Sequence, residues 1–276
     1  MQSLRILLNV PILNEIDNIE HLVTSIRREM DGLDYVLLIV DDGSTDGTLE
    51  YLNRILPESG GHIAILSRRK VIRGCQRGAA LLAGVRWGLA NGPFDIFVEM
   101  DGDLSHRPEE LRAGVERIAR GDVDIAIASK YVPGSRITGR SMGRTLVSIV
   151  CNLAVRGLIQ WQIKDFSNGY RFYNLRAAAL VPQYFIRYGS PIYLTEAMAI
   201  WLSHGLRVVE IPGHYVGRHE GWSKVRLRDY IKASIGIFEI ASRYWIRGFT
   251  RDTSFHPGAV AGPATAEKTA AGGRTK

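Results

Sequence analysis

The sequence predicts an α/β protein in which a mostly parallel, Rossmann-like sheet is flanked by helices. In the first half of the chain, short apolar runs alternate with segments whose apolar residues recur at helical spacing, as in βαβ units. Two of these runs end in acidic clusters, Asp41-Asp42 and Asp101-Gly102-Asp103. Because open α/β sheets bind ligands at the carboxyl ends of their strands, the two clusters also predict where the functional site lies.

The order of the elements follows from the same signals. The apolar runs predict strands over residues 4–10, 35–40, 63–66, 94–100 and 123–129. Asp17 and Glu20 resemble a capping box that opens the first helix, and Ser44-Thr45-Asp46 supplies oxygens to start the second. Beyond residue 130 we expect helices over 142–160 and 194–202, and a strand over 207–211.

Composition suggests three regions. Residues 1–224 are expected to form the catalytic domain and 225–249 a helical extension. Residues 250–276 are rich in Ala, Gly, Thr and Pro, so we expect a disordered tail. In the extension, charged residues fall near one helical face and apolar residues near the other: Arg228, Lys232, Glu239, Arg243 and Arg247 against Leu227, Ile231, Ile235, Phe238 and Trp245. Such a helix could lie at a membrane surface, pack on the domain, or join a dimer or a membrane-anchoring subunit.

Charge and cysteine content narrow the class of protein. The 276 residues carry a formal net charge of +7, which favours anionic partners such as phosphates or acidic lipid. Nucleic acid is disfavoured because the basic residues do not form one stripe interleaved with aromatic residues. Two cysteines, the lack of a signal peptide and the lack of a membrane-spanning apolar run predict a cytoplasmic protein that can associate peripherally with a membrane.

The acidic clusters predict a metal site. Asp101 and Asp103 stand two residues apart on an extended segment, so both can face one cation, and Gly102 leaves room for a ligand. Hard oxygen ligands suit Mg²⁺ or Mn²⁺, and such an ion suits a diphosphate. We expect Asp41, Asp42, Asp101 and Asp103 to gather round this ion; an ordinary Asp-Gly turn is the alternative. The signatures of P-loop hydrolases, dinucleotide oxidoreductases and α/β hydrolases are absent from the sequence.

Taken in order, the motifs resemble those of the inverting glycosyltransferase family 2, which has the GT-A fold, and within it the polyprenol-phosphate (dolichol-phosphate) mannosyltransferase branch. The resemblance runs from about Leu4 to Lys224. It rests on five matches in sequence order: residues 11–15, residues 40–48, residues 100–109, Arg218 and Lys224.

The resemblance implies roles for particular residues. Nucleotide-binding residues would be Pro11, Leu13, Glu15, Val40, Asp41, Asp42 and Gly102. Asp101, Asp103 and Ser105 would hold the metal. Asp103, Arg171, Arg218 and Lys224 would act in catalysis, the last two from a cationic loop. Lys130, Arg140 and Arg144 would bind the acceptor phosphate.

The implied reaction moves a hexose from a nucleotide sugar, GDP-mannose or a UDP-sugar, to a polyprenyl phosphate. Departures such as Asn168-Gly169-Tyr170, which is closer to relatives from cell-surface polysaccharide pathways, leave the sugar open. Two alternatives remain. A saccharide, protein or small-molecule hydroxyl could be the acceptor, in which case Asp165 or Glu196 would remove its proton. Paired aspartates at strand ends also occur in phospho-accepting or nucleotide-sensing modules.

Overall fold

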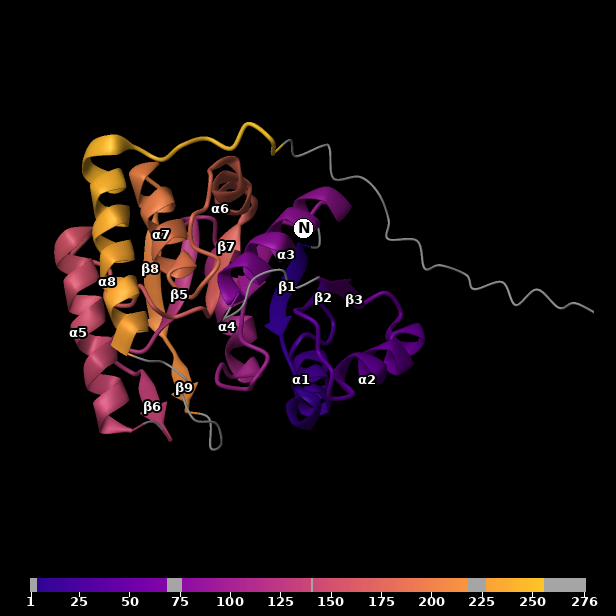
Figure 1. Ribbon diagram of the computed structural model, residues 1–276. Helices are drawn as coiled ribbons and strands as arrows, with labels where there is room; N and C mark the ends of the chain where they lie inside the picture. Colours follow the sequence, from indigo (N-terminus) through magenta and orange to yellow (C-terminus); the bar gives the residue numbers. More distant parts are fainter. Residues whose placement is uncertain (1–3, 69–75, 140, 218–226, 256–276) are drawn as a thin grey trace, which may run out of the picture.

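The computed structural model describes residues 4–68, 76–139, 141–217 and 227–255. The predicted fold class is confirmed, with a central sheet between two layers of helices (Figure 1). The strands of this sheet are β1 (Arg5–Ile12), β2 (Asp34–Asp41), β3 (Ile63–Ser67), β4 (Ile96–Glu99), β5 (Ile125–Ser129), β7 (Arg171–Asn174) and β8 (Val208–Pro212).

Their spatial order is β3-β2-β1-β4-β7-β5-β8. All pairings are parallel except those of β7, which runs antiparallel to both β4 and β5. The sequence did not predict β7. It consists of four residues that follow an irregular segment, too few for a periodic signal. Because β7 is reversed, its first residue and the segment before it lie at the same edge of the sheet as the carboxyl ends of the other strands.

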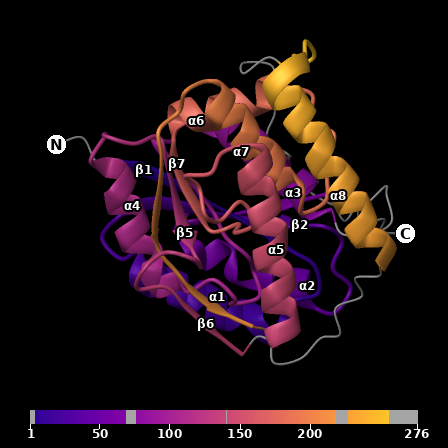
Figure 2. The same ribbon diagram turned by 90° about the vertical axis from the view of Figure 1, so that its left-hand side faces the viewer.

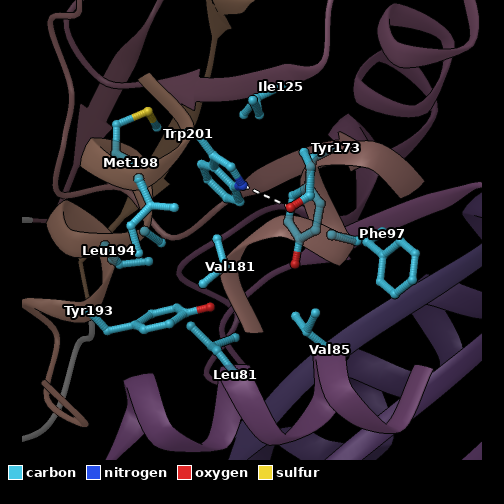
Figure 3. Close-up of a cluster of buried hydrophobic side chains, with 14 of the residues drawn as sticks. Leu81, Val85, Phe97, Ile125, Tyr173, Val181, Tyr193, Leu194, Met198 and Trp201 are labelled. Carbon is cyan, nitrogen blue, oxygen red and sulfur yellow. Dashed lines mark hydrogen bonds between the residues drawn. The ribbon is translucent and has the colours of Figure 1, made fainter. Parts of the chain in front are cut away.

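Helices cover both faces of the sheet. One core cluster joins the sheet to α1 (Ile16–Glu29), α2 (Thr48–Ile55) and α4 (Leu111–Ala119). The other joins it to α3 (Arg77–Asn91), α6 (Leu175–Leu180), α7 (Tyr193–Ser203) and α8 (Leu227–Ser242). In the second cluster, Trp201 packs beside Tyr173 (Figure 3). The indole nitrogen of Trp201 donates to the Ala177 carbonyl at 2.9 Å. This bond satisfies a polar group that is buried in the core.

The remaining elements connect or cover these layers. They are the single turns η1 (Pro57–Ser59), η2 (Pro108–Glu110) and η3 (Val181–Gln183), the helix α5 (Met142–Leu158), the π-helical turn η4 (Arg243–Arg247), and the strands β6 (Arg136–Thr138) and β9 (His214–Val216). The two strands form a separate parallel pair. α5 and α8 lie side by side at one side of the molecule in both views (Figures 1 and 2).

The start of α1 differs from the prediction. The helix begins at Ile16, and the expected capping box of Asp17 and Glu20 is wrong because no side chain of the helix caps it. Instead the Ile16 amide donates to Asp46 at 3.0 Å, and the Glu15 amide donates to the Thr48 hydroxyl at 3.0 Å. Asp46 also accepts from the Thr48 amide at 3.0 Å, as its predicted helix-starting role requires. The first two helices therefore share their capping groups across the sheet edge.

The C-terminal segment after η4 returns across the domain (Figure 1). Tyr184 and Arg251 form an isolated antiparallel bridge, and Arg86 pairs with Asp252 at 3.0 Å. The expectation that disorder begins at residue 250 is therefore wrong for residues 250–255. The rest of the predicted tail lies outside the described residues.

Candidate functional site

Three predicted site segments meet at one edge of the sheet. β2 and β4 flank β1, with Asp41 opposite Ile12 and Glu99 opposite Asn9. The segments that follow these strands, residues 13–15, 42–46 and 100–105, are therefore neighbours. Residues 130–135 after β5, residues 165–170 before β7 and the β9 strand after β8 lie at the same edge, because strand direction places them there.

The Asp41 and Asp42 carboxylates are bound by neighbouring groups of the protein. The Asp41 carboxylate is buried and accepts hydrogen bonds from the Gly43 and Ser44 amides, each at 3.1 Å. Asp42 forms an ion pair with Arg68 at 2.8 Å. Asp41 thus shapes the turn after β2. The expectation that all four aspartates surround one ion is wrong, since no three His, Cys, Asp or Glu side chains of the described residues lie close enough to hold a metal.

The predicted nucleotide-binding residues differ in exposure. Leu13 is 40% exposed, and Pro11 and Glu15 are partly exposed, so all three can contact a ligand. Glu15 accepts a hydrogen bond from the Asn18 side chain at 2.8 Å. The Val40 side chain is fully buried in the core, so only its backbone can face the site.

The segment 101–105 forms a tight turn with hard oxygen atoms. The Asp103 carboxylate accepts from the Ser105 amide at 3.0 Å, and Leu104 has a φ of 60°. The Ser105 hydroxyl is buried without a hydrogen-bond partner, which costs free energy unless a ligand uses it. Gly102 lies so close to β1 that an added Cβ would be 2.7 Å from Ile12. Two carboxylates and a hydroxyl suit Mg²⁺ or Mn²⁺ if a bound diphosphate completes the coordination.

Arg77, at the start of α3, pairs with Asp101. Its Nε lies 2.5 Å from Asp101 Oδ1. Neither Arg77 nor Arg68 was predicted as a site residue, although the segment from residue 68 to 78 is rich in basic side chains. Arg68 and Arg77, the described ends of that segment, each neutralise a predicted site aspartate.

Comparison with known proteins decides the family. The family model described as glycosyl transferase family 2 matches residues 8–180, more than half of the chain. The chain belongs to glycosyltransferase family 2.

Relatives of this glycosyltransferase have closely related names. It is 32% identical over 246 residues to the polyprenol monophosphomannose synthase of Mycolicibacterium smegmatis, covering 88% of both chains. It is also 32% identical over 226 residues to the undecaprenyl-phosphate mannosyltransferase of Micrococcus luteus, covering 80% of this chain and 88% of the relative. Both matches bear out the resemblance inferred from the motifs.

Solved structures confirm the fold. Glucosyl-3-phosphoglycerate synthase of Mycobacterium tuberculosis, crystallised with Mn²⁺, UDP and glucosyl-3-phosphoglycerate, superposes with a TM-score of 0.60 over 88% of this chain and 80% of that chain. The sequence identity is 18%. The GT-A-like architecture of the family 2 enzyme is therefore shared with an enzyme that was crystallised with a divalent metal and a nucleoside diphosphate.

Lys130, which was predicted to bind the acceptor phosphate, is already paired within the protein. Its Nζ is 3.1 Å from Asp165 Oδ2, and the two side chains are 5% and 0% exposed. Burial by itself raises the pKa of Asp165, but Lys130 and several hydrogen bonds outweigh it and hold that pKa below its usual value. Asp165 is thus a fixed anion and cannot serve as the base of the hydroxyl-acceptor alternative.

Glu196 is equally unsuitable as a base. It is fully buried, its Oε1 lies 2.5 Å from the Arg243 guanidinium, and it accepts from the Arg187 and Tyr188 amides. Both carboxylates that were predicted as possible bases are therefore engaged in buried ion pairs.

Arg171, which the resemblance assigns to catalysis, is bound by carbonyl groups of the protein itself. The side chain is fully buried and donates to the carbonyls of Asn168, Leu194 and Phe166 at 2.8–2.9 Å. Burial lowers the pKa of its guanidinium, partly offset by Glu99. Its function is to hold the segment before β7 in place.

The other predicted cations cannot be located. Arg218, Lys224 and Arg140 lie outside the described residues, and Arg144 is on α5 but its side chain is not described. β9 ends at Val216, directly before the predicted cationic loop, and the Val216 amide donates to the Ser105 carbonyl at 3.1 Å. The end of β9 therefore lies beside the turn formed by residues 101–105.

Proposed function

We propose that this enzyme transfers a hexose, mannose in the first instance, from a nucleoside diphosphate sugar to the phosphate of a polyprenyl lipid. The relatives named for this reaction match over most of their length. The observation that carries the proposal is an apolar surface beside the site, formed by α5 and the C-terminal helices. A sugar or protein acceptor would not require such a surface, whereas a lipid must be taken from a membrane.

The apolar surface includes the most exposed large hydrophobic side chains of the described residues. Those of α5 are Met142, Leu146, Val147, Ile149, Val150 and Leu153, and those of α8 and η4 are Ile235, Phe238, Trp245 and Ile246. Met142 is 89% exposed and Ile246 is 82% exposed. The Trp245 indole donates to the Leu158 carbonyl at 2.6 Å, which ties η4 to the end of α5.

The orientation of α8 explains why this surface is open. Ile240 and Ala241 pack in the core. Arg243 and Glu239, two residues of the predicted charged face, pair with Glu196 and Arg187 of the domain. The helix is fixed through these contacts and turns the predicted apolar residues Ile235, Phe238 and Trp245 outward. The part of the extension that begins at residue 225 and precedes α8 lies outside the described residues, as do the side chains of Leu227, Arg228, Ile231 and Lys232.

We therefore propose that α5 and the C-terminal helices rest on the headgroup region of an anionic membrane. Arg156, stacked on Trp161 at 4.3 Å, and the exposed Arg247 add positive charge at this surface. None of the helices in the described ranges is long and apolar enough to cross a bilayer.

The chemistry suits an acceptor that is already an anion. A phosphate oxygen attacks the anomeric carbon, the bond from that carbon to the diphosphate breaks, and the configuration inverts, with no proton to remove. A divalent ion, when bound, offsets the charge of the departing diphosphate. Asp101, Asp103 and Ser105 would hold that ion, and Arg77 lies beside them to counter further charge. Pro11, Leu13, Glu15 and Asp42 would bind the nucleoside, and Arg218 and Lys224 the phosphates.

Product extraction tests the reaction. Purified enzyme is incubated with Mn²⁺ or Mg²⁺, polyprenyl phosphate and labelled GDP-mannose, with labelled UDP-hexoses in parallel. We expect label to enter the organic phase only when polyprenyl phosphate is present. Label that moves instead to water-soluble saccharide or protein acceptors would overturn the proposal in favour of the hydroxyl-acceptor alternative.

Vesicle binding tests the surface separately. The double substitution Phe238→Ser with Ile246→Ser removes two exposed side chains of the apolar surface, while Leu175→Ser removes one that is 47% exposed elsewhere. Loss of apolar burial predicts at least about tenfold weaker binding to phosphatidylglycerol vesicles for the double variant. The Leu175 variant should bind like the wild type, and equal binding by all three proteins would contradict this docking surface.

A further inference from the structure

A buried hydrogen-bond chain leads from the metal-binding turn to the acceptor side of the site. His106, 2% exposed, accepts at Nδ1 from the Asp101 amide at 2.9 Å. Its Nε2 lies 2.9 Å from Asn168 Oδ1. The imidazole is stacked on Tyr170 with the ring centroids 5.0 Å apart, so it has little freedom to turn.

The hydrogen-bond partners of His106 and Asn168 determine which atoms carry the protons. Because the Asp101 amide donates to Nδ1, the ring proton is on Nε2 and is donated to Asn168. The Asn168 amide nitrogen donates in turn to the Ala128 carbonyl of β5, which fixes the orientation of the Asn168 side chain.

Asn168 also belongs to the Lys130 ion pair. The backbone amide of Asn168 donates to Asp165 Oδ1 at 3.0 Å. Asp165 Oδ2 accepts from the backbone amide of Lys130 at 3.0 Å and also pairs with the Lys130 ammonium group. Asn168 therefore contacts both His106, which accepts from the Asp101 amide, and Asp165, which pairs with Lys130.

We propose that Asn168, acting through His106, is a positioning residue for the metal-binding turn and couples it to the Lys130 and Asp165 pair. Asn168 forms hydrogen bonds with His106, Asp165 and Ala128. The side-chain oxygen of Asn168 keeps His106 in the one tautomer that can accept from the Asp101 backbone amide. This arrangement orients the Asp101 and Asp103 carboxylates so that both can bind one cation. This inference rests on the proposed function, in which that turn binds a divalent ion with a nucleoside diphosphate.

The test measures metal binding rather than turnover. Mn²⁺ is titrated calorimetrically into the enzyme saturated with GDP or UDP, whichever binds the wild type more tightly. Asn168→Ser removes the bond to His106 and should weaken Mn²⁺ binding about tenfold or more, the usual effect of losing an outer partner of a metal ligand.

A matched control is available on α5. Asn152 is also buried and holds the same segment, accepting from the Phe166 amide at 2.9 Å and donating to the Ser167 hydroxyl at 3.1 Å, but it does not contact His106. Asn152→Ser should lower the melting temperature as Asn168→Ser does, yet change Mn²⁺ affinity less than about twofold. Equal Mn²⁺ affinities for the two variants would overturn the inference.

A second variant keeps the test decisive if Asn168→Ser does not fold. His106→Asn retains an oxygen that can accept from the Asp101 amide but is too short to reach Asn168, so it should show the same loss of Mn²⁺ affinity. In the double variant the losses should not add, because both break one link. Wild-type affinity in His106→Asn would overturn the inference alone, whereas a wild type that binds no Mn²⁺ with either nucleotide would overturn the proposed function with it.

Discussion

Removing the Lys130 ammonium group should destabilise the fold as well as affect the acceptor side. The Lys130 and Asp165 charges lie 3.1 Å apart with side chains that are 5% and 0% exposed, so neither is solvated when its partner is lost. Breaking a buried pair costs about 3–5 kcal/mol. Asp165 keeps hydrogen bonds from the Lys130, Ser167 and Asn168 amides, so we expect Lys130→Met to lower the free energy of unfolding by about 3 kcal/mol.

Urea unfolding at pH 7 measures the difference in free energy of unfolding between the wild type and Lys130→Met. Repeating the measurement over a pH series tests whether that difference is electrostatic. The pKa of Asp165 is lower in the folded state, so its contribution to stability is complete above the unfolded value of about 3.9 and is lost as the pH falls through the folded value. The wild type and Lys130→Met should therefore converge as the pH drops below about 4. Lys164→Met, at a partly exposed neighbouring position, should change stability by less than about 0.5 kcal/mol. If Lys130→Met unfolds at the wild-type midpoint, the lysine is not a structural ion-pair partner.

Three other substitutions test separate parts of the protein. Asp103→Ala should reduce metal-dependent turnover by more than about a hundredfold while the melting temperature without metal stays near that of the wild type, and retained activity would exclude Asp103 as a ligand. Burial raises the pKa of Glu110 to about 7, although the carboxylate accepts from the His214 amide at 2.6 Å. The protonated carboxyl group therefore favours the folded state, and this contribution to stability is lost as the pH rises from about 4.3 to about 7. Glu110→Gln should therefore raise the melting temperature relative to the wild type at pH 8 but not at pH 4, and an equal shift at both would contradict the assignment. Gly169→Ala would place a Cβ 1.9 Å from Arg77 Nη2 and push that guanidinium off Asp101, which should weaken calorimetric nucleotide binding in the presence of Mn²⁺ about tenfold.

The sequence was most informative where a signal is local. The five strands of the first half occur where the apolar runs predict them, with ends that differ by at most two residues, because burial on both faces demands continuous apolar residues. β6, β7 and β9 were not predicted. Each is four residues or fewer, and their strand form depends on partners far away in the chain.

The site residues also divide into those that local sequence signals predict and those that depend on contacts between distant segments. The positions of Asp41 and Asp101 at one edge could be predicted because strand order and direction alone bring strand ends together. The burial of Arg171 could not, since its three carbonyl acceptors come from a loop and from α7. His106 and Asn168 were likewise missed as a pair, because 62 residues separate them and neither carries a distinctive spacing.

By itself, the sequence determined the fold class, the family and the edge of the sheet that bears the chemistry. Strand patterns and ordered motifs are properties of neighbouring residues, so they can be identified before the chain is folded. Only the tertiary structure decided which charges remain available to ligands and which are neutralised internally, as with Asp42 and Arg68 or Lys130 and Asp165. It also decided that α8 turns its apolar residues outward. A charged side chain takes the partner that is nearest in space, and that partner is set by how distant segments pack.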